Sequence, residues 1–366
     1  MLTPEPLGLS PTLTGRVRRW TDCFRDGYTG AGFVTTMERD AIWREQRRKI
    51  ADFYARFSEH EARGSSPVYE DWANSIATDP AILALLDELP GMKVQPNLVF
   101  AAARLLGAPV GPFAPFREWL LHNWSRVTRV VLERMTQTNE AGRCAELLPT
   151  LTRIPGPTAL IEVDASAGLG LYPDRYSYRY DTGNATTALD PADGPSDVIL
   201  SCRIDAPSVP DHLPDVVSRA GIDLSPIDVR HLTELEWLET LVWPEHDERR
   251  RRLRAAAQLV AADPPVLLQG DLLEEVSGVV ALAPRDATVV VFHSAVLVYV
   301  DPDERRKFID LMTRLTDVEW ISNEGEHVIP SVAAQLPQLP AGRTVLARNG
   351  RPVALVGPHG QSFESL

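Results

Sequence analysis

The chain of 366 residues carries 50 acidic and 37 basic side chains, and its net charge of −13 disfavours nucleic acid and anionic membrane surfaces as partners. Apolar residues make up 44% of the chain and charged residues 24%, which excludes a disordered or fibrous protein. The length predicts about two domains, and the 30 scattered prolines indicate long ordered loops.

The three cysteines, Cys23, Cys144 and Cys202, are far apart in the sequence. They predict neither a disulfide framework nor a cysteine zinc site, and they favour a reducing compartment. The first residues do not have the pattern of a secretory signal, and the longest apolar run, residues 287–300, is shorter than a membrane span. We therefore expect a cytoplasmic protein that acts away from the membrane.

Apolar residues recur at a spacing of three to four from about residue 15 to residue 151. The clearest of these segments are residues 43–57, 81–89, 97–107 and 116–135. This period is typical of amphipathic helices. The pattern predicts an α-helical cap region over residues 1–151, where a substrate would be held.

From residue 152 to residue 366, short apolar runs alternate with helical stretches, which predicts an α/β domain with a mostly parallel sheet. The predicted strands lie around residues 160–163, 198–202, 216–224, 265–268, 288–300, 318–321, 343–348 and 352–356, with helices in 230–262 and 303–315. The alternation in residues 174–180 predicts a β-rich insertion at about 172–215. Asn349-Gly350 between the last two strands predicts a closing antiparallel hairpin.

The first of these strands ends at Glu162 and continues into small residues as far as Gly168. Such a loop lets the backbone approach a ligand closely. The segment resembles the nucleotide loop of class I S-adenosylmethionine-dependent methyltransferases, in which G-x-G-x-G follows an acidic residue. Asp164 and Ser166 stand at the first two glycine positions, and only Gly168 keeps its glycine.

The resemblance implies a Rossmann-like fold, S-adenosylmethionine as the cofactor, and methyl transfer to a small molecule or peptide. It assigns Glu162, Asp164, Ser166 and Gly168 to the methionine portion of the cofactor, Asp223 to the ribose hydroxyls and Asp271 to the adenine. The acidic bulk of the chain would suit the cationic sulfonium. The wide separation of Glu162 and Asp223 requires an insertion after the first strand.

Polar side chains gather just before the first strand, at Gln137, Asn139, Glu140 and Arg143. Asn139 and Arg143 are candidates for the mouth of the cofactor site. The alternative is a helix start with an ion pair between Glu140 and Arg143, three residues apart.

His293 is the main catalytic candidate, because it lies at the expected end of the fourth strand and an imidazole can remove a proton before methyl transfer. The alternative is a core histidine bonded to Ser294 or to the backbone. Asp174 and Tyr299 are further catalytic candidates. Secondary candidates are Glu324 and Glu326, whereas His327 and His359 are interpreted as loop residues, and the spacing of the histidines predicts no metal site.

Two other functions remain open. Residues 164–168 also resemble the G-x-S-x-G elbow of α/β-hydrolases, with Ser166 as the nucleophile and His293 or His359 as the base. In the other alternative, the helical region binds a protein partner and the α/β domain is a degenerate, non-enzymatic cofactor fold, because Asp164 alters the most diagnostic loop.

Motifs along nearly the whole chain resemble an uncharacterised, largely actinobacterial family, domain of unknown function 2332. They lie at residues 64–80, 137–143, 162–169, 174–178, 221–229, 241–253 and 357–362. The resemblance implies a methyltransferase-like fold and no assigned reaction. The family loop reads E-x-G-x-S-A-G-L-N, so that Asp164 and Gly170 depart from it.

Overall fold

The computed structural model describes residues 36–137, 139–336, 342–357 and 359–366, with side chains from residue 45 onward. The chain divides into two compact units. The helical unit contains the described residues up to Thr136 together with Trp243–Glu245, and the sheet unit contains Gln137–Val242 and His246–Leu366. The sequence predicted that the helical region ends at residue 151, but the helical unit ends at Thr136, because residues 137–151 pack with the sheet.

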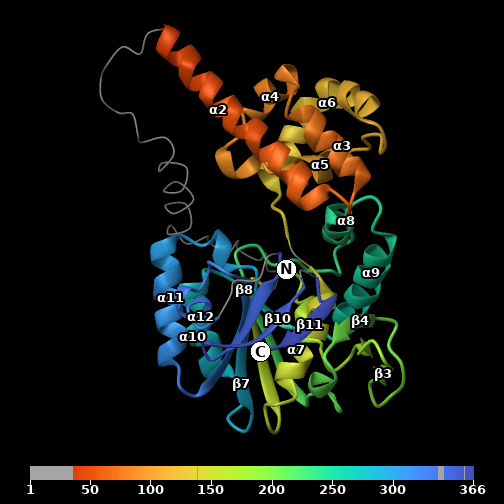
Figure 1. The fold of residues 1–366 in the computed structure, drawn as a ribbon, viewed down its shortest axis with the longest axis vertical. Coiled ribbons are helices and arrows are strands. Elements are labelled where there is room, and N and C mark those ends of the chain that lie inside the picture. The colour runs from red at the N-terminus through yellow and green to blue at the C-terminus, as the bar shows by residue number, and fades with distance from the viewer. Residues whose placement is uncertain (1–35, 138, 337–341, 358) are drawn as a thin grey trace, which may run out of the picture. The chain divides into compact units, whose positions relative to one another are not determined.

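The helical unit consists of packed helices, as the periodicity predicted (Figure 1). They are α2 (Thr36–Phe57), α3 (Pro67–Ile76), α4 (Pro80–Leu86), α5 (Pro96–Leu105) and α6 (Phe113–Glu133), with the short turns η2 (Ser58–Ala62) and η3 (Gly91–Lys93). Prolines stand in the first turn of α3, α4 and α5, where a missing N–H costs little. The side chains of Ser66 and Asp79 cap α3 and α4.

The segment Trp243–Glu245 completes the core of the helical unit although it lies far along the chain. The Trp243 ring packs against Phe57 and Tyr69, with centroid distances of 5.8 and 5.5 Å. Glu245 accepts hydrogen bonds from Ser66 Oγ at 2.6 Å and from the Val68 N–H at 3.0 Å. These three residues, which interrupt the sequence of the sheet unit, thus supply the helical unit with an aromatic core side chain and with a hydrogen-bond acceptor at the start of α3.

The helices of the sheet unit are α7 (Cys144–Leu151), α8 (Leu232–Leu241), α9 (Asp247–Ala262), α10 (Leu272–Leu282), α11 (Pro302–Arg314) and α12 (Pro330–Ala333), with short turns η4 (Ala141–Arg143), η5 (Leu169–Leu171), η6 (Ala206–Ser208) and η7 (Leu297–Tyr299). The strands are β1 (Thr158–Val163), β2 (Ser177–Asp181), β3 (Thr186–Leu189), β4 (Ile199–Ile204), β5 (Val216–Asp223), β6 (Val266–Gln269), β7 (Thr288–Ser294), β8 (Val318–Gly325), β9 (Thr344–Arg348), β10 (Arg351–Val356) and β11 (Ser362–Ser365).

The described strands form one mixed sheet in the order β3-β2-β4-β11-β10-β9-β8-β7-β1-β5-β6. The run from β8 to β6 is parallel, which confirms the prediction of a large, mostly parallel sheet with α/β alternation. β9 and β10 form an antiparallel hairpin, and Asn349 and Gly350 at its turn both have positive φ, at 51° and 73°. The sequence did not predict α10, α12 or β11, and it covered β3 only through the predicted β-rich insertion.

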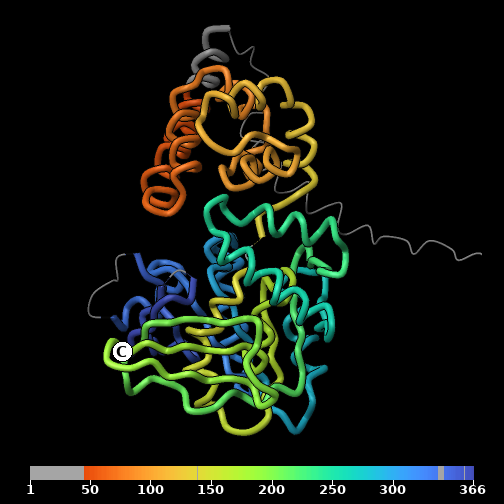
Figure 2. The backbone as a smooth tube through the Cα atoms, turned by 90° about the vertical axis from the view of Figure 1, so that its right-hand side faces the viewer, coloured from red at the N-terminus to blue at the C-terminus, as the bar shows by residue number. Residues whose placement is uncertain are grey.

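The connection between β1 and β5 contains β2, β3 and β4 where a crossover helix would usually lie, and Figure 2 shows these yellow-green strands side by side. β2 and β4 continue the sheet beyond the C-terminal strands, with β11 as their neighbour. Only the short turn η5 follows the loop after β1. The sheet therefore has no helix whose N-terminus begins directly at this loop.

The two faces of the central sheet pack against different helices. Ile161, Val291 and Trp320 belong to a buried cluster with apolar residues of α10 and α11, which lie together at one side of the sheet in Figure 1. Glu162 and Phe292 alternate with these residues, so their side chains point to the opposite face. That face meets α7, where Asn323 of β8 bonds to Glu146.

Candidate functional site

A small cavity lies at the carboxyl ends of β1 and β7, within the sheet unit. Its volume is about 40 Å³. We call it the acidic cavity; its walls are Asn139, Glu140, Arg143, Cys144, Glu146, Leu147, Glu162, Val163, Asp164, Ala165, Leu169, Gly170, Phe292, His293, Ser294, Ile321, Asn323 and Leu346. The order of the strands reverses at β1, because β5 follows on one side and β7 on the other. Ligands of open α/β sheets bind at such switch points.

Carboxyl groups dominate the acidic cavity. Burial raises the pKa of Glu146 to about 8 against the pull of Arg143, and Glu146 is 1% exposed. Burial also raises the pKa of Glu162 to about 8, again opposed by Arg143. Asp164 lies at the solvent-exposed mouth. These three acids lie near one guanidinium, that of Arg143, so the cavity becomes negative when the acids ionise.

Several oxygen atoms of the cavity walls have no hydrogen-bond donor within the described residues. They are Oε2 of Glu146, Oε2 of Glu162 and Oδ1 of Asn323. The Glu146 Oε1 atom, by contrast, accepts from Asn323 Nδ2 at 2.5 Å. Buried acceptors of this kind are costly unless a proton, a water molecule or a ligand satisfies them.

The loop after β1 is bound closely to its neighbours. Its residues Asp164, Ser166 and Gly168 all have positive φ, at 64°, 50° and 71°. The Ser166 N–H donates to Asp223 at 2.7 Å, and the Asn139 side chain donates to Ser166 Oγ and accepts from the Ala167 N–H. Asn139 and Asp223 thus hold the loop in an unusual backbone conformation.

The residues expected to bind a nucleoside have other partners. Both oxygens of Asp223 accept from backbone N–H groups, of Ser166 and of Ser225, at 2.7 Å each. Asp271 caps α10 by accepting from the Leu273 N–H at 2.8 Å, in place of a role beside adenine. The acidic cavity holds on the order of three water-sized groups. The acidic cavity therefore has room for a small cationic group and not for a nucleoside.

His293 is one of the wall residues of the acidic cavity, but both nitrogens of its ring are bonded within the core. Its Nδ1 bonds to Glu324 Oε1 at 2.7 Å, and its Nε2 accepts from the Trp320 indole at 3.1 Å. The ring packs edge-on against Phe308 of α11, and the residue is 1% exposed. Because both ring nitrogens are bonded, this geometry favours the core-histidine alternative, although the partners are Glu324 and Trp320 and not Ser294.

Glu324 organises the turn after β7. Its Oε1 accepts from the N–H groups of Val296 and Leu297 as well as from His293. The predicted strand 288–300 therefore ends at Ser294, where Ala295 takes a φ of 55° and the chain turns away. Tyr299 lies on this turn, 67% exposed and outside the cavity walls.

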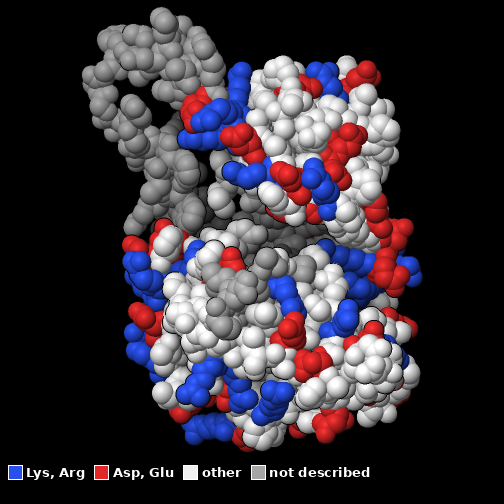
Figure 3. All heavy atoms as spheres, in the orientation of Figure 1, with Lys and Arg blue, Asp and Glu red and all other residues white. Residues whose placement is uncertain are grey.

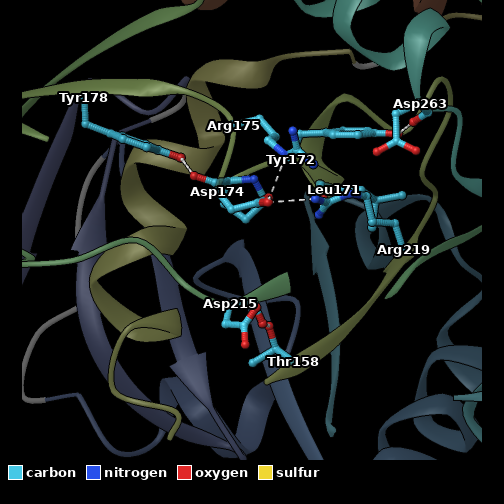
Figure 4. A network of polar contacts seen from close by, with 10 residues as sticks. Thr158, Leu171, Tyr172, Asp174, Arg175, Tyr178, Asp215, Arg219 and Asp263 are labelled. Carbon is cyan, nitrogen blue, oxygen red and sulfur yellow. Dashed lines mark hydrogen bonds and ion pairs between the residues drawn. The ribbon is translucent and has the colours of Figure 1, made fainter. Parts of the chain in front are cut away.

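Asp174 lies in a structural network, which Figure 4 shows. It pairs with Arg219 at 2.7 Å and with Arg175 at 3.3 Å, and the Arg219 guanidinium also lies over the Tyr172 ring. The network joins the β1–β2 connection to β5. Because Asp174 is not a wall residue of the acidic cavity, the structure does not bring it together with the other site candidates.

Glu140 is buried, but the predicted pair with Arg143 is replaced by ion pairs with Arg249 and Arg252 of α9. Burial would raise the pKa of Glu140, but these two guanidinium groups outweigh it and hold the pKa below its usual value. Residues 249–254 of α9 include five arginines, and two of them are therefore directed inward. Arg143 donates to the Ser294 carbonyl at 2.8 Å instead.

The hydrolase alternative lacks a catalytic pair in the described residues. Ser166 is 1% exposed, and its Oγ bonds to Asn139 and not to a histidine. His293 bonds to Glu324 and Trp320. His359 lies near Glu140 and Arg249, and burial together with Arg249 lowers its pKa to about 4.

Glu146 and Asn323 were not predicted as site residues. Glu146 follows Cys144 on a short helix that is buried along its whole length, and this single acid in an apolar helix was the available signal. Asn323 lies on β8, and nothing in its local sequence marks it. Their pairing at 2.5 Å joins α7 to the sheet and forms the inner wall of the cavity.

The described residues include neither a metal-binding group of His, Cys, Asp or Glu side chains nor a helix long and apolar enough to cross a membrane. Figure 3 shows basic and acidic side chains interspersed on the visible face of the sheet unit. The segments 1–35 and 337–341, which include Cys23, lie outside the described residues.

Comparison with known families gives one match. The family model described as "Uncharacterized protein conserved in bacteria (DUF2332)" matches residues 51–365. No curated protein and no solved structure matches the chain.

Proposed function

We propose that this chain, which belongs to the DUF2332 family of uncharacterised bacterial proteins, binds a small organic cation in its acidic cavity. The observation that carries the proposal is the set of unpartnered carboxyl oxygens of Glu146 and Glu162 in one cavity at the switch point of the sheet. Leaving one buried oxygen of each carboxyl group without a donor is unfavourable, and a cationic ligand would relieve both the missing hydrogen bonds and the excess negative charge.

Within this class we propose S-adenosylmethionine as the ligand and methyl transfer to a small molecule or peptide as the reaction. The compound carries both a sulfonium and an ammonium group. The parallel order β6-β5-β1-β7-β8 corresponds to the order 3-2-1-4-5 of a Rossmann-like sheet, in which β1 is central and the loop after it approaches the ligand. Glu162 at the end of β1 and Asp164 in the loop lie where the cationic end would bind.

Binding of the nucleoside would require the loop after β1 to open. Each Asp223 oxygen accepts one backbone N–H and keeps a free lone pair, but the residue is only 5% exposed, so the loop would have to move before a ribose could reach it. The same contacts favour the second candidate, a degenerate cofactor fold that has kept the cation pocket and lost the nucleoside site. In that case the protein binds a small cation without methyl transfer.

Calorimetric titration with S-adenosylmethionine and S-adenosylhomocysteine tests the proposal, because the two ligands differ in the sulfonium charge. We expect S-adenosylmethionine to bind more tightly than S-adenosylhomocysteine, and Glu162→Gln to reduce the difference. Glu319→Gln is the control, since Glu319 pairs with Arg348 outside the cavity. Absence of binding of both compounds at millimolar concentration would refute the methyltransferase function and leave the degenerate fold.

A further inference from the structure

We propose that the inner end of the acidic cavity is a site for a primary ammonium group, so that the ligand is a primary amine that enters with its –NH3+ end first. The inference rests on the proposed binding of a cation and narrows it to one chemical class. It follows from the number of free acceptors, the local charge and the size of the cavity.

The free acceptors match the donors of an ammonium group. Glu146 and Asn323 are 1% and 6% exposed, and each has an oxygen without a donor; Glu162 supplies a third. The Asn323 amide orientation is fixed, because Nδ2 donates to Glu146 Oε1 at 2.5 Å and to Ser294 Oγ at 3.0 Å. A primary ammonium has three donors and no acceptor, whereas a sulfonium or a quaternary ammonium has no donor.

The local charge favours a cation over water. The wall residue Glu140 is already paired with Arg249 and Arg252. Of the remaining walls, Glu146, Glu162 and Asp164 can contribute three negative charges, and Arg143 contributes one positive charge. The Arg143 Nη1 atom also donates to the Ser294 carbonyl at 2.8 Å, so its hydrogen bonds are shared with the backbone. A water molecule could satisfy two acceptors but would leave the charge uncompensated.

The size of the cavity sets the shape of the ligand. A volume of about 40 Å³ admits an ammonium head and one or two methylene groups. Phe292, Ile321 and Leu346 provide apolar wall for those methylene groups. A trimethylammonium head needs more room and leaves all three acceptors unsatisfied.

The experiment is calorimetric titration of the full chain with n-butylamine and with n-butyltrimethylammonium. The buffer is phosphate at pH 8, because Tris is itself a primary amine. We expect n-butylamine to bind at least ten times more tightly than the quaternary compound. Glu146→Gln and Glu162→Gln should each weaken n-butylamine at least tenfold, while Glu319→Gln, on the same strand as Asn323, should bind as the wild type does.

Equal binding of the two compounds, no binding of n-butylamine at millimolar concentration, or full binding by Glu146→Gln would each overturn the assignment. The Gln variants preserve the shape of the neutral carboxyl, so circular dichroism should show a folded chain.

Competition with S-adenosylmethionine separates two sources of the ammonium. Displacement of n-butylamine identifies the amino group of that compound as an occupant, whereas simultaneous binding indicates a separate amine substrate. Binding of n-butylamine without any binding of S-adenosylmethionine would refute the proposed methyltransferase and keep the amine site.

Discussion

Replacing Glu146 by glutamine should stabilise the protein, and more so at alkaline pH. The Glu146 carboxyl has a pKa of about 8 in the folded protein, against a usual value of 4.5, chiefly because it is buried. Below pH 4.5 the carboxyl is protonated in both states. Between pH 4.5 and 8 the unfolded chain loses the proton and the folded protein keeps it, so the free energy of unfolding falls as the pH rises. Glutamine cannot ionise and removes this loss.

The size of the effect follows from the two pKa values. Each pKa unit corresponds to about 1.4 kcal/mol, which sets an upper limit of roughly 4 to 5 kcal/mol for the full interval. Because structure and water relax around a buried charge, we expect Glu146→Gln to gain about 2 kcal/mol more at pH 8.5 than at pH 5. The new amide can donate to Asn323 Oδ1 or Glu162 Oε2, which otherwise have no donor.

Urea unfolding followed by tryptophan fluorescence at both pH values measures the difference. Glu319→Gln is the matched control, because the Arg348 side chain lowers the pKa of Glu319 through a hydrogen bond. Its loss should destabilise the protein equally at pH 5 and 8.5. A gain for Glu146→Gln that does not change with pH, or a loss at pH 8.5, would show that Glu146 is ionised in the folded protein and would refute the reasoning.

Three other substitutions test the packing of the two units, two in the sheet unit and one in the helical unit. Gly170→Ala should cost about 2 kcal/mol and weaken amine binding, because its Cβ would overlap the Glu162 carboxyl, whereas Gly278→Ala has open space and should leave urea unfolding unchanged or improve it slightly. His293→Ala should lower the free energy of unfolding by about 3 kcal/mol through lost packing and two lost hydrogen bonds. Trp243→Ala should cost about 3 kcal/mol, seen as earlier urea unfolding of the helical circular dichroism signal.

Local sequence patterns were sufficient to predict the positions of most helices and strands. Alternating apolar runs located β5, β6, β8, β9 and β10 within a few residues, because strand formation depends on residues adjacent in the chain. Among the elements that the sequence did not locate individually, β3 and β11 are short and largely exposed, so their sequences have little apolar pattern. The boundary at residue 151 differed from the division after Thr136, since the helical period of α7 does not reveal which unit it packs against.

The residues of the candidate site likewise include some that local sequence patterns could mark and some whose roles depend on tertiary contacts. Glu162 and Asp164 could be marked in advance, because an acidic strand end followed by small residues is a local pattern. The roles of His293 and Asp174 could not be determined, because they depend on which face of a strand meets α11 and on which arginine lies opposite. The loop after β1 was visible in the sequence, but its anchoring by Asn139 and Asp223 was not.

The sequence by itself determined the acidic composition, the α/β alternation and the turn at Asn349-Gly350, all of which depend on residue type and on neighbours in the chain. Only the tertiary structure decided that Glu146 of α7, Glu162 of β1 and Asn323 of β8 share one cavity. Hydrogen bonding and desolvation act through space, and these residues come from three distant segments. Their unpartnered oxygens, and the amine site inferred from them, exist only once the sheet and α7 have packed together.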